Sequence, residues 1–96
     1  MDILVAYDVN TLTKAGRSRL RRVAKVCEGS GQRVQLSVFE CTVSEAQMEI
    51  FRTRLLKVID ENEDNLRIYR LHGRRQDVVE SYGRDSYVDF QQPLVI

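Results

Sequence analysis

The chain has 96 residues, which is long enough for one hydrophobic core and too short for a second domain. Its 15 basic and 14 acidic residues leave a formal net charge of +1, so the overall charge indicates neither a nucleic acid nor a membrane as partner. The two cysteines, Cys27 and Cys41, match no CxxC or zinc-site spacing and are predicted to be reduced and buried.

The first predicted element is a strand at residues 3–9, which is rich in β-formers and poor in polar side chains. This pattern predicts a strand buried on both faces, near the centre of a sheet. Asp2 stands where a signal peptide would need a basic residue, and the apolar run is too short to cross a bilayer. We therefore expect a cytoplasmic protein with no membrane partner.

A helix is predicted from residue 13 to about residue 28. Its apolar residues recur at helical spacing, and they are Leu20, Val23, Ala24 and Cys27. Gly29 and Gly31 are predicted to end it. The β-forming stretch 33–43 is too long for one average strand, so we expect it to bend near Ser37 into a hairpin or a bulged pair.

A second helix is predicted to begin after Ser44, because residues 44–47 have the form of a capping box. Its apolar face continues through Phe51, Leu55, Val58 and Ile59, and acidic residues follow. Residues 66–71 alternate between apolar and mostly basic side chains, which is typical of a half-exposed strand.

The order of these elements predicts an α+β fold, a ferredoxin-like βαββαβ sandwich over residues 1–72. Two helices would cover one face of the sheet and leave the other open, which predicts a homodimer. Residues 73–96 are predicted to form a C-terminal extension with a surface turn and a short helix. Its apolar end, residues 93–96, would add an edge strand that is exchanged with the partner or packed at the dimer interface.

Basic residues are concentrated in the first predicted helix, which has no acidic residue between Lys14 and Lys25. Helical spacing puts four of them in one stripe, with Arg19 and Arg22 beside it. Such a stripe is either simply solvated or a site for nucleic-acid phosphates. No acidic residue lies four positions after Arg17 or Arg21, so pairing within the helix does not explain it. The candidate nucleic-acid-binding residues are Lys14, Arg17, Arg21, Arg22, Lys25 and Arg33.

Several local strings of the sequence together carry a family resemblance. They are Tyr7-Asp8-Val9, Gly16 with residues 21–25, the stretch 33–41 with its Gln-x-Ser-Val-Phe-Glu core, and residues 66–71. In this order and spacing, residues 1–72 resemble the small spacer-acquisition subunit of the CRISPR-associated proteins, the second of two universal adaptation proteins. The resemblance implies a ferredoxin-like homodimer, often with exchanged C-terminal strands, that bridges two dimers of an integrase partner. Members are also described as metal-dependent endonucleases on RNA or DNA.

Asp8 carries the enzymatic hypothesis. A carboxylate at the end of a buried strand can hold Mg²⁺, and two copies of Asp8 facing each other across a dimer axis could share one ion. From residue type alone, Asp8 is more simply a cap on the turn into the helix. The family resemblance favours the metal, and makes Asp8 the candidate catalytic and metal-binding residue.

The remaining candidates each have two interpretations. Tyr7, Phe39 and Tyr69 could stack on unpaired bases, although packing in the core or at the dimer interface is the better explanation. Tyr7, Ser37 and Phe39 are candidates for a supporting role around Asp8, and Ser37 is equally a turn residue. His72, the only histidine, is best read as a surface loop residue.

Three functions remain open at the level of sequence. The leading one is a dimeric DNA-binding scaffold that bridges dimers of the CRISPR integrase during spacer acquisition and supports duplex DNA. The alternative is a Mg²⁺-dependent endonuclease on single-stranded RNA or on DNA. A regulator or toxin-like ribonuclease with the same small sheet is the third.

Overall fold

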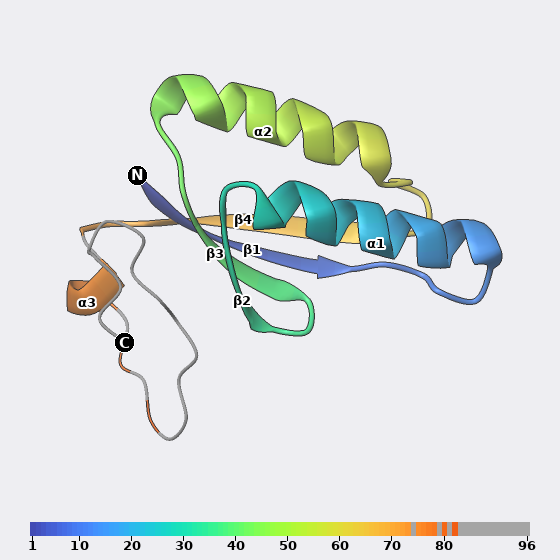
Figure 1. Cartoon of the computed structure of the whole chain (residues 1–96), viewed down its shortest axis with the longest axis horizontal. Helices are drawn as coiled ribbons and strands as arrows, with labels where there is room; N and C mark the ends of the chain where they lie inside the picture. The colour runs from blue at the N-terminus through green and yellow to red at the C-terminus, as the bar shows by residue number, and fades with distance from the viewer. Residues whose placement is uncertain (74, 79, 81, 83–96) are drawn as a thin grey trace.

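One antiparallel sheet and two long helices dominate the structure, a computed structural model that describes residues 1–73, 75–78, 80 and 82 (Figure 1). The elements in chain order are β1 (Asp2–Asp8), α1 (Lys14–Glu28), β2 (Gly31–Gln35), β3 (Val38–Thr42), α2 (Glu45–Val58), β4 (Asn65–Leu71) and α3 (Arg75–Val78). The four strands are ordered β2-β3-β1-β4, with every neighbouring pair antiparallel. The predicted ferredoxin-like order and the interior position of β1 are confirmed.

Both helices begin where local chemistry supplies a cap. The Thr13 hydroxyl accepts a hydrogen bond from the Gly16 N–H at the start of α1. At the start of α2, the Ser44 hydroxyl accepts from the Gln47 N–H, and the Gln47 side chain accepts from the Ser44 N–H. The predicted capping box is therefore confirmed.

The stretch predicted to bend near Ser37 does form a hairpin. The β2–β3 pairing shifts register between Arg33 and Gln35, as a bulge does. Gly31 differs from the prediction, because it begins β2 and does not end α1. A Cβ on Gly31 would overlap the carbonyl oxygen of Glu40, so only glycine lets the two strands approach this closely.

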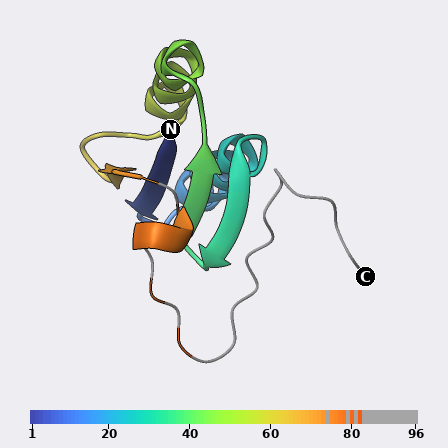
Figure 2. The ribbon, with the colours of Figure 1, turned by 90° about the vertical axis from the view of Figure 1, so that its left-hand side faces the viewer.

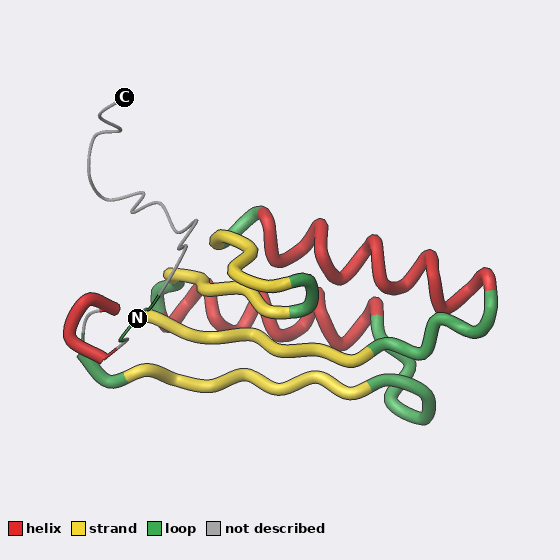
Figure 3. The backbone as a smooth tube through the Cα atoms, turned by 90° about the horizontal axis from the view of Figure 1, so that it is seen from below, coloured by secondary structure: helices red, strands yellow, loops and turns green. Residues whose placement is uncertain are grey.

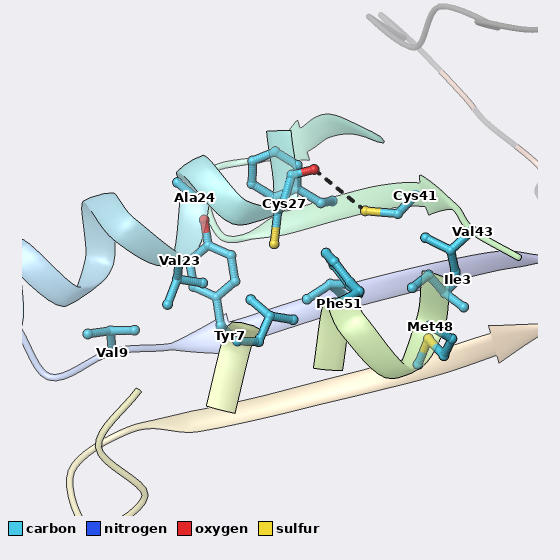
Figure 4. Packing of buried hydrophobic residues seen from close by; sticks show 13 residues of the cluster. Ile3, Tyr7, Val9, Val23, Ala24, Cys27, Cys41, Val43, Met48 and Phe51 are labelled. Carbon is cyan, nitrogen blue, oxygen red and sulfur yellow. Dashed lines mark hydrogen bonds between the residues drawn. The ribbon is translucent and has the colours of Figure 1, made fainter. Parts of the chain in front are cut away.

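The core lies between the sheet and the two helices, which cover the same face (Figures 1 and 2). Strand β1 contributes Ile3, Val5 and Tyr7 to it. Figure 4 shows Ile3 and Tyr7 within this cluster. The side chains that fill it from the other elements are Val9, Val23, Ala24, Cys27, Phe39, Cys41, Val43, Met48, Phe51 and Leu55. Both cysteines are free and buried, as predicted.

The opposite face of the sheet is covered by neither α1 nor α2 (Figure 3). Directly opposed residues of antiparallel strands share a face, so Leu4 of β1 lies beside Glu40 of β3 and Tyr69 of β4 on this side. Leu4 and Ala6 are half-buried. Strand β1 is therefore fully buried on one face only, and the prediction of burial on both faces was wrong for the single subunit. We call the uncovered side the open face.

The C-terminal extension is described only in part. Its predicted short helix is α3, and Gly73 before it has a positive φ of 83°, which suits a turn made by glycine. The predicted edge strand at residues 93–96 lies outside the described residues. No helix in the described ranges is long and apolar enough to span a bilayer.

Candidate functional site

Asp8 lies at the carboxyl end of β1, on the open face. Its neighbour Tyr7 points into the core, and side chains alternate along a strand, so Asp8 points to the other side. It is exposed and stands directly opposite Asn65 of β4. The sheet therefore holds the Asp8 backbone in a regular ladder while its carboxylate faces solvent.

The Asp8 carboxylate has no hydrogen-bond or ion-pair partner among the residues that the structure describes. Asp2, at the other end of the same strand and on the same face, accepts a hydrogen bond from the Thr42 hydroxyl at 2.9 Å. Both oxygens of Asp8 thus remain available to a ligand. Among the same residues no group of three or more His, Cys, Asp or Glu side chains could hold a metal ion.

A network of hydrogen bonds fixes the segment that follows Asp8. The Asn10 N–H donates to Asp64 Oδ1 at 3.0 Å, and Asn10 Nδ2 donates to Glu63 at 2.7 Å. Asn10 Oδ1 accepts from the Leu12 N–H at 3.0 Å. The β1–α1 loop is therefore tied to the loop that precedes β4.

Asp64 also binds helix α1. Arg19 Nε donates to its Oδ2 at 2.8 Å, and the Asp64 side chain is fully buried. Burial alone would raise the pKa of Asp64, but the hydrogen bonds from Arg19, Asp60 and Asn10 hold it below its ordinary value of 3.8. The hydrogen bond to Asp64 likewise raises the pKa of Arg19. Helical spacing puts Arg19 beside the basic stripe, but its positive charge is paired with the Asp64 carboxylate.

Tyr7 and Phe39 lie on the helix side of the sheet, away from the Asp8 carboxylate. Their rings stack with centroids 6.3 Å apart, and both are buried. Burial, together with the nearby Cys27 thiol, raises the pKa of Tyr7 above its ordinary value of 10.0. The idea that these two rings stack on bases is wrong, and core packing is confirmed. These rings can affect Asp8 only indirectly, by fixing the backbone of the strands that carry them.

Ser37 and Tyr69 are the two remaining candidates near the sheet. The Ser37 carbonyl accepts a hydrogen bond from the Tyr7 N–H at 3.1 Å, so the β2–β3 turn meets β1 just before Asp8. Tyr69 is on the open face, 45% exposed, and its hydroxyl is 3.4 Å from Arg67. Tyr69 is thus the aromatic ring of the three candidates that remains accessible.

The basic stripe runs along the outer side of α1. The helix buries Gly16, Val23, Ala24 and Cys27, and at helical spacing the stripe lies on the opposite side. Its four members and Arg22 beside it are exposed, and within the described residues none of these side chains forms a salt bridge; the four members are Lys14, Arg17, Arg21 and Lys25. Arg17 is oriented by donating to the Thr11 carbonyl at 3.2 Å. The stripe is an accessible row of positive charge.

Arg33 stands apart from the stripe, on β2. It lies 3.8 Å from a carboxylate oxygen of Glu28, and its guanidinium carbon is 5.2 Å from the centroid of the Phe39 ring. Its side chain is nevertheless 44% exposed. Arg33 therefore has an ion-pair partner, which the stripe residues lack among the residues that the structure describes.

His72 is exposed and follows β4, as predicted for a surface loop residue. The preceding Leu71 stands opposite Asp2, at the far end of β1 from Asp8. Six residues of strand separate these ends by about 20 Å. Within one subunit, His72 therefore cannot act beside Asp8.

Comparison with known proteins shows the family. The family model of CRISPR associated protein Cas2 matches residues 1–78. A relative from Moorella thermoacetica, called CRISPR-associated endoribonuclease Cas2 1, is 54% identical over 96 residues that span all of both chains. A relative from Halalkalibacterium halodurans, called CRISPR-associated endonuclease Cas2, is 45% identical over 95 residues and 99% of each chain.

Solved structures agree with these relatives. The crystal structure of Streptococcus pyogenes Cas2 at pH 6.5 superimposes with a TM-score of 0.78 and 53% sequence identity, over 86% of this chain and 100% of that chain. The resemblance that the sequence strings carried is therefore confirmed. The chain belongs to the Cas2 family of CRISPR-associated proteins.

Proposed function

We propose that this chain is a CRISPR-associated, metal-dependent endonuclease that cleaves single-stranded RNA, or DNA, as a homodimer with Asp8 as its metal-binding residue. The observation that carries the proposal is the exposed carboxylate of Asp8 on a fixed strand end, which has no partner in the part of the chain that the structure describes. Relatives named endoribonuclease and endonuclease support it. The sequence alone favoured the DNA-binding scaffold over the endonuclease, and the present proposal reverses that preference.

The residues present fit Mg²⁺ if two subunits combine. Mg²⁺ takes one or two carboxylates and fills its other positions with water and phosphate oxygens. One Asp8 from each subunit would complete such a set, and like charges brought together in this way favour a shared cation. When bound, the ion would neutralise charge on the phosphate and lower the pKa of a coordinated water.

The open face supports the dimer that this site needs. It presents the half-buried Leu4 and Ala6 together with Tyr69, which a second copy could cover about a two-fold axis. An axis beside the carboxyl end of β1 brings the two Asp8 residues together. No histidine of the same subunit reaches this end of the strand, so none is available there as a general base.

The test compares cleavage of labelled single-stranded RNA and duplex DNA by the wild type and Asp8→Asn, purified in parallel, with and without Mg²⁺. Asp2→Asn is the matched control, because it changes a carboxylate on the same face at the opposite end of β1. We expect Mg²⁺-dependent cleavage to disappear in Asp8→Asn and to persist in Asp2→Asn. Equal cleavage by all three proteins would contradict the proposal.

A second function is favoured by a separate observation, the row of exposed basic residues on the outer side of α1, which form no salt bridge with any described residue. In a dimer that joins through the open face, both copies of this helix face outward. They could hold the phosphates of duplex DNA without reading its sequence while the protein bridges dimers of the CRISPR integrase. This role requires no cleavage by the chain itself.

Salt dependence of duplex binding tests the second function. Replacing Arg17 and Arg21 with alanine should weaken binding and lower the salt slope by about one phosphate contact per residue in each subunit. Arg52→Ala is the control, because Arg52 lies on α2 and is paired with Glu49 at 2.8 Å. A salt slope that is unchanged by the double substitution would contradict a role for the stripe.

A further inference from the structure

The buried carboxylate of Asp64 joins three separate parts of the chain near Asp8. Its Oδ1 accepts from the Asn10 N–H at 3.0 Å, and its Oδ2 accepts from Arg19 Nε at 2.8 Å and from the Asp60 N–H at 2.9 Å. Arg19 NH2 adds a longer contact of 3.3 Å to Oδ1. One side chain thus connects the β1–α1 loop, helix α1 and the loop before β4.

We infer that Asp64 is a positioning residue for the Asp8 site. It would act through Asn10, two residues after Asp8, and it would set the direction of the Asp8 carboxylate without touching substrate. This inference deepens the proposed endonuclease function and rests on it. The Asp64 side chain is fully buried and already paired with Arg19, so it is not available as a metal ligand.

Two adjacent residues, Asp64 and Asn65, contact the chain at and just after Asp8. The β1–β4 ladder places Asn65 opposite Asp8, and Asp64 is the residue just before Asn65. Asp64 then binds the backbone beyond Asp8 through the Asn10 N–H. The strand end at Asp8 is therefore held by its pairing with Asn65, and the loop after it is held by the hydrogen bond from Asn10 to Asp64. An exposed carboxylate keeps one orientation only when the backbone around it is fixed in this way.

Arg19 gives this arrangement its rigidity. A buried carboxylate is stable as an anion only when it is paired and hydrogen-bonded, and Asp64 receives both from Arg19. Because Arg19 sits on α1, the same pair fixes the start of the basic helix relative to Asp8. The metal site and the basic stripe are thus positioned by one contact between residues 45 positions apart.

Groups that orient metal ligands typically change metal affinity or activity by about 10–100-fold when they are removed. We therefore expect Asp64→Asn to raise the Mg²⁺ concentration for half-maximal cleavage by about that factor. The amide hydrogen of Asn10 should exchange faster, because its acceptor becomes a neutral amide oxygen. The double variant Arg19→Gln/Asp64→Asn keeps the net charge of the wild type and should show the same shift.

Two controls separate positioning from charge and from stability. Glu61→Gln removes an exposed carboxylate from the same loop, and we expect its Mg²⁺ dependence to match the wild type. Val43→Ala weakens the core beside Met1, at the end of β1 far from Asp8, and serves as a variant of reduced stability. Its half-maximal Mg²⁺ concentration should be unchanged at a temperature where it stays folded.

The decisive comparison uses cleavage, Asn10 exchange and binding of Mn²⁺ measured by broadening of the Asp8 amide signal. Faster Asn10 exchange in Asp64→Asn with unaltered Mg²⁺ dependence and Mn²⁺ binding would overturn the positioning role and leave the proposed function intact. If the wild type shows no cleavage that depends on Asp8, the proposed function fails. Weaker Mn²⁺ binding in Asp64→Asn would then still support positioning, and equal or absent Mn²⁺ binding would overturn it.

Discussion

The carbonyl oxygen of Asn10 occupies the place where residue 16 would carry a Cβ atom. A Cβ built on Gly16 would overlap that oxygen and approach the Thr13 hydroxyl to 3.3 Å. The first turn of α1 therefore packs directly on the loop that follows Asp8. This close approach depends on the absence of a side chain at position 16.

Gly16→Ala should destabilise the protein and disturb the Asp8 loop. Alanine favours the helix by up to about 1 kcal/mol, but the clash with backbone costs about 1–3 kcal/mol. Thermal unfolding and Mg²⁺-dependent cleavage measure the two effects. Gly29→Ala is the control, since a Cβ there meets the Val26 carbonyl at an ordinary 3.4 Å. Equal stability of Gly16→Ala and the wild type would contradict this account of the turn.

Stability should fall at acid pH in a way that depends on Asp64. Its pKa is lower in the folded state than its ordinary value of 3.8, so the folded carboxylate releases its proton more readily than the unfolded one. Its stabilising contribution is complete above about pH 4 and is lost as the pH falls through the lower, folded pKa. Denaturant unfolding from neutral to acid pH should show a smaller loss for Asp64→Asn than for the wild type. Parallel curves for the two proteins would refute the assignment.

The two cysteines should be unreactive in the folded protein. Burial, with a smaller contribution from nearby charges, raises the pKa of both Cys27 and Cys41 to about 12. Little thiolate then exists at pH 8, and the thiolate is the reactive form. A thiol-reactive dye should label the native protein slowly and label both residues quickly after denaturation. Fast labelling of either residue in the native state would show that the core around it opens.

The proposed dimer predicts that a charge on the open face separates the subunits. Leu4→Arg would bury an unpaired charge, which costs a few kcal/mol, or about 100-fold or more in the dissociation constant. Leu56→Arg is the control, because Leu56 is 45% exposed on α2. Sedimentation should find a folded monomer for Leu4→Arg and a dimer for Leu56→Arg. A Leu4→Arg protein that remains a dimer would place the interface elsewhere.

Features that depend on neighbouring residues were predictable from the sequence. The capping box at Ser44 starts α2, and the spacing of Val23, Ala24 and Cys27 gives α1 its buried side. Alternation along 66–71 likewise predicted β4, which the structure extends by one residue to Asn65. In each case the controlling contacts are local, within one or two turns or between adjacent residues of one strand.

The contacts that surround Asp8 were not predictable in the same way. Arg19 and Asp64 are 45 positions apart, so no local pattern in the sequence links them. Asn10 gave no signal, because a polar residue after a strand is ordinary in a turn. Gly31 was assigned to the end of α1, since its real constraint, the close approach of Glu40, comes from strand pairing.

The central claim is that the exposed carboxylate of Asp8 supports metal-dependent cleavage. The most direct measurement is Mg²⁺-dependent cleavage of labelled single-stranded RNA by the wild type, Asp8→Asn and Asp2→Asn purified in parallel, with duplex DNA as a second substrate. We predict cleavage by the wild type and Asp2→Asn only, with duplex binding retained by all three. No cleavage by the wild type, or cleavage by Asp8→Asn at the wild-type rate, would contradict the claim.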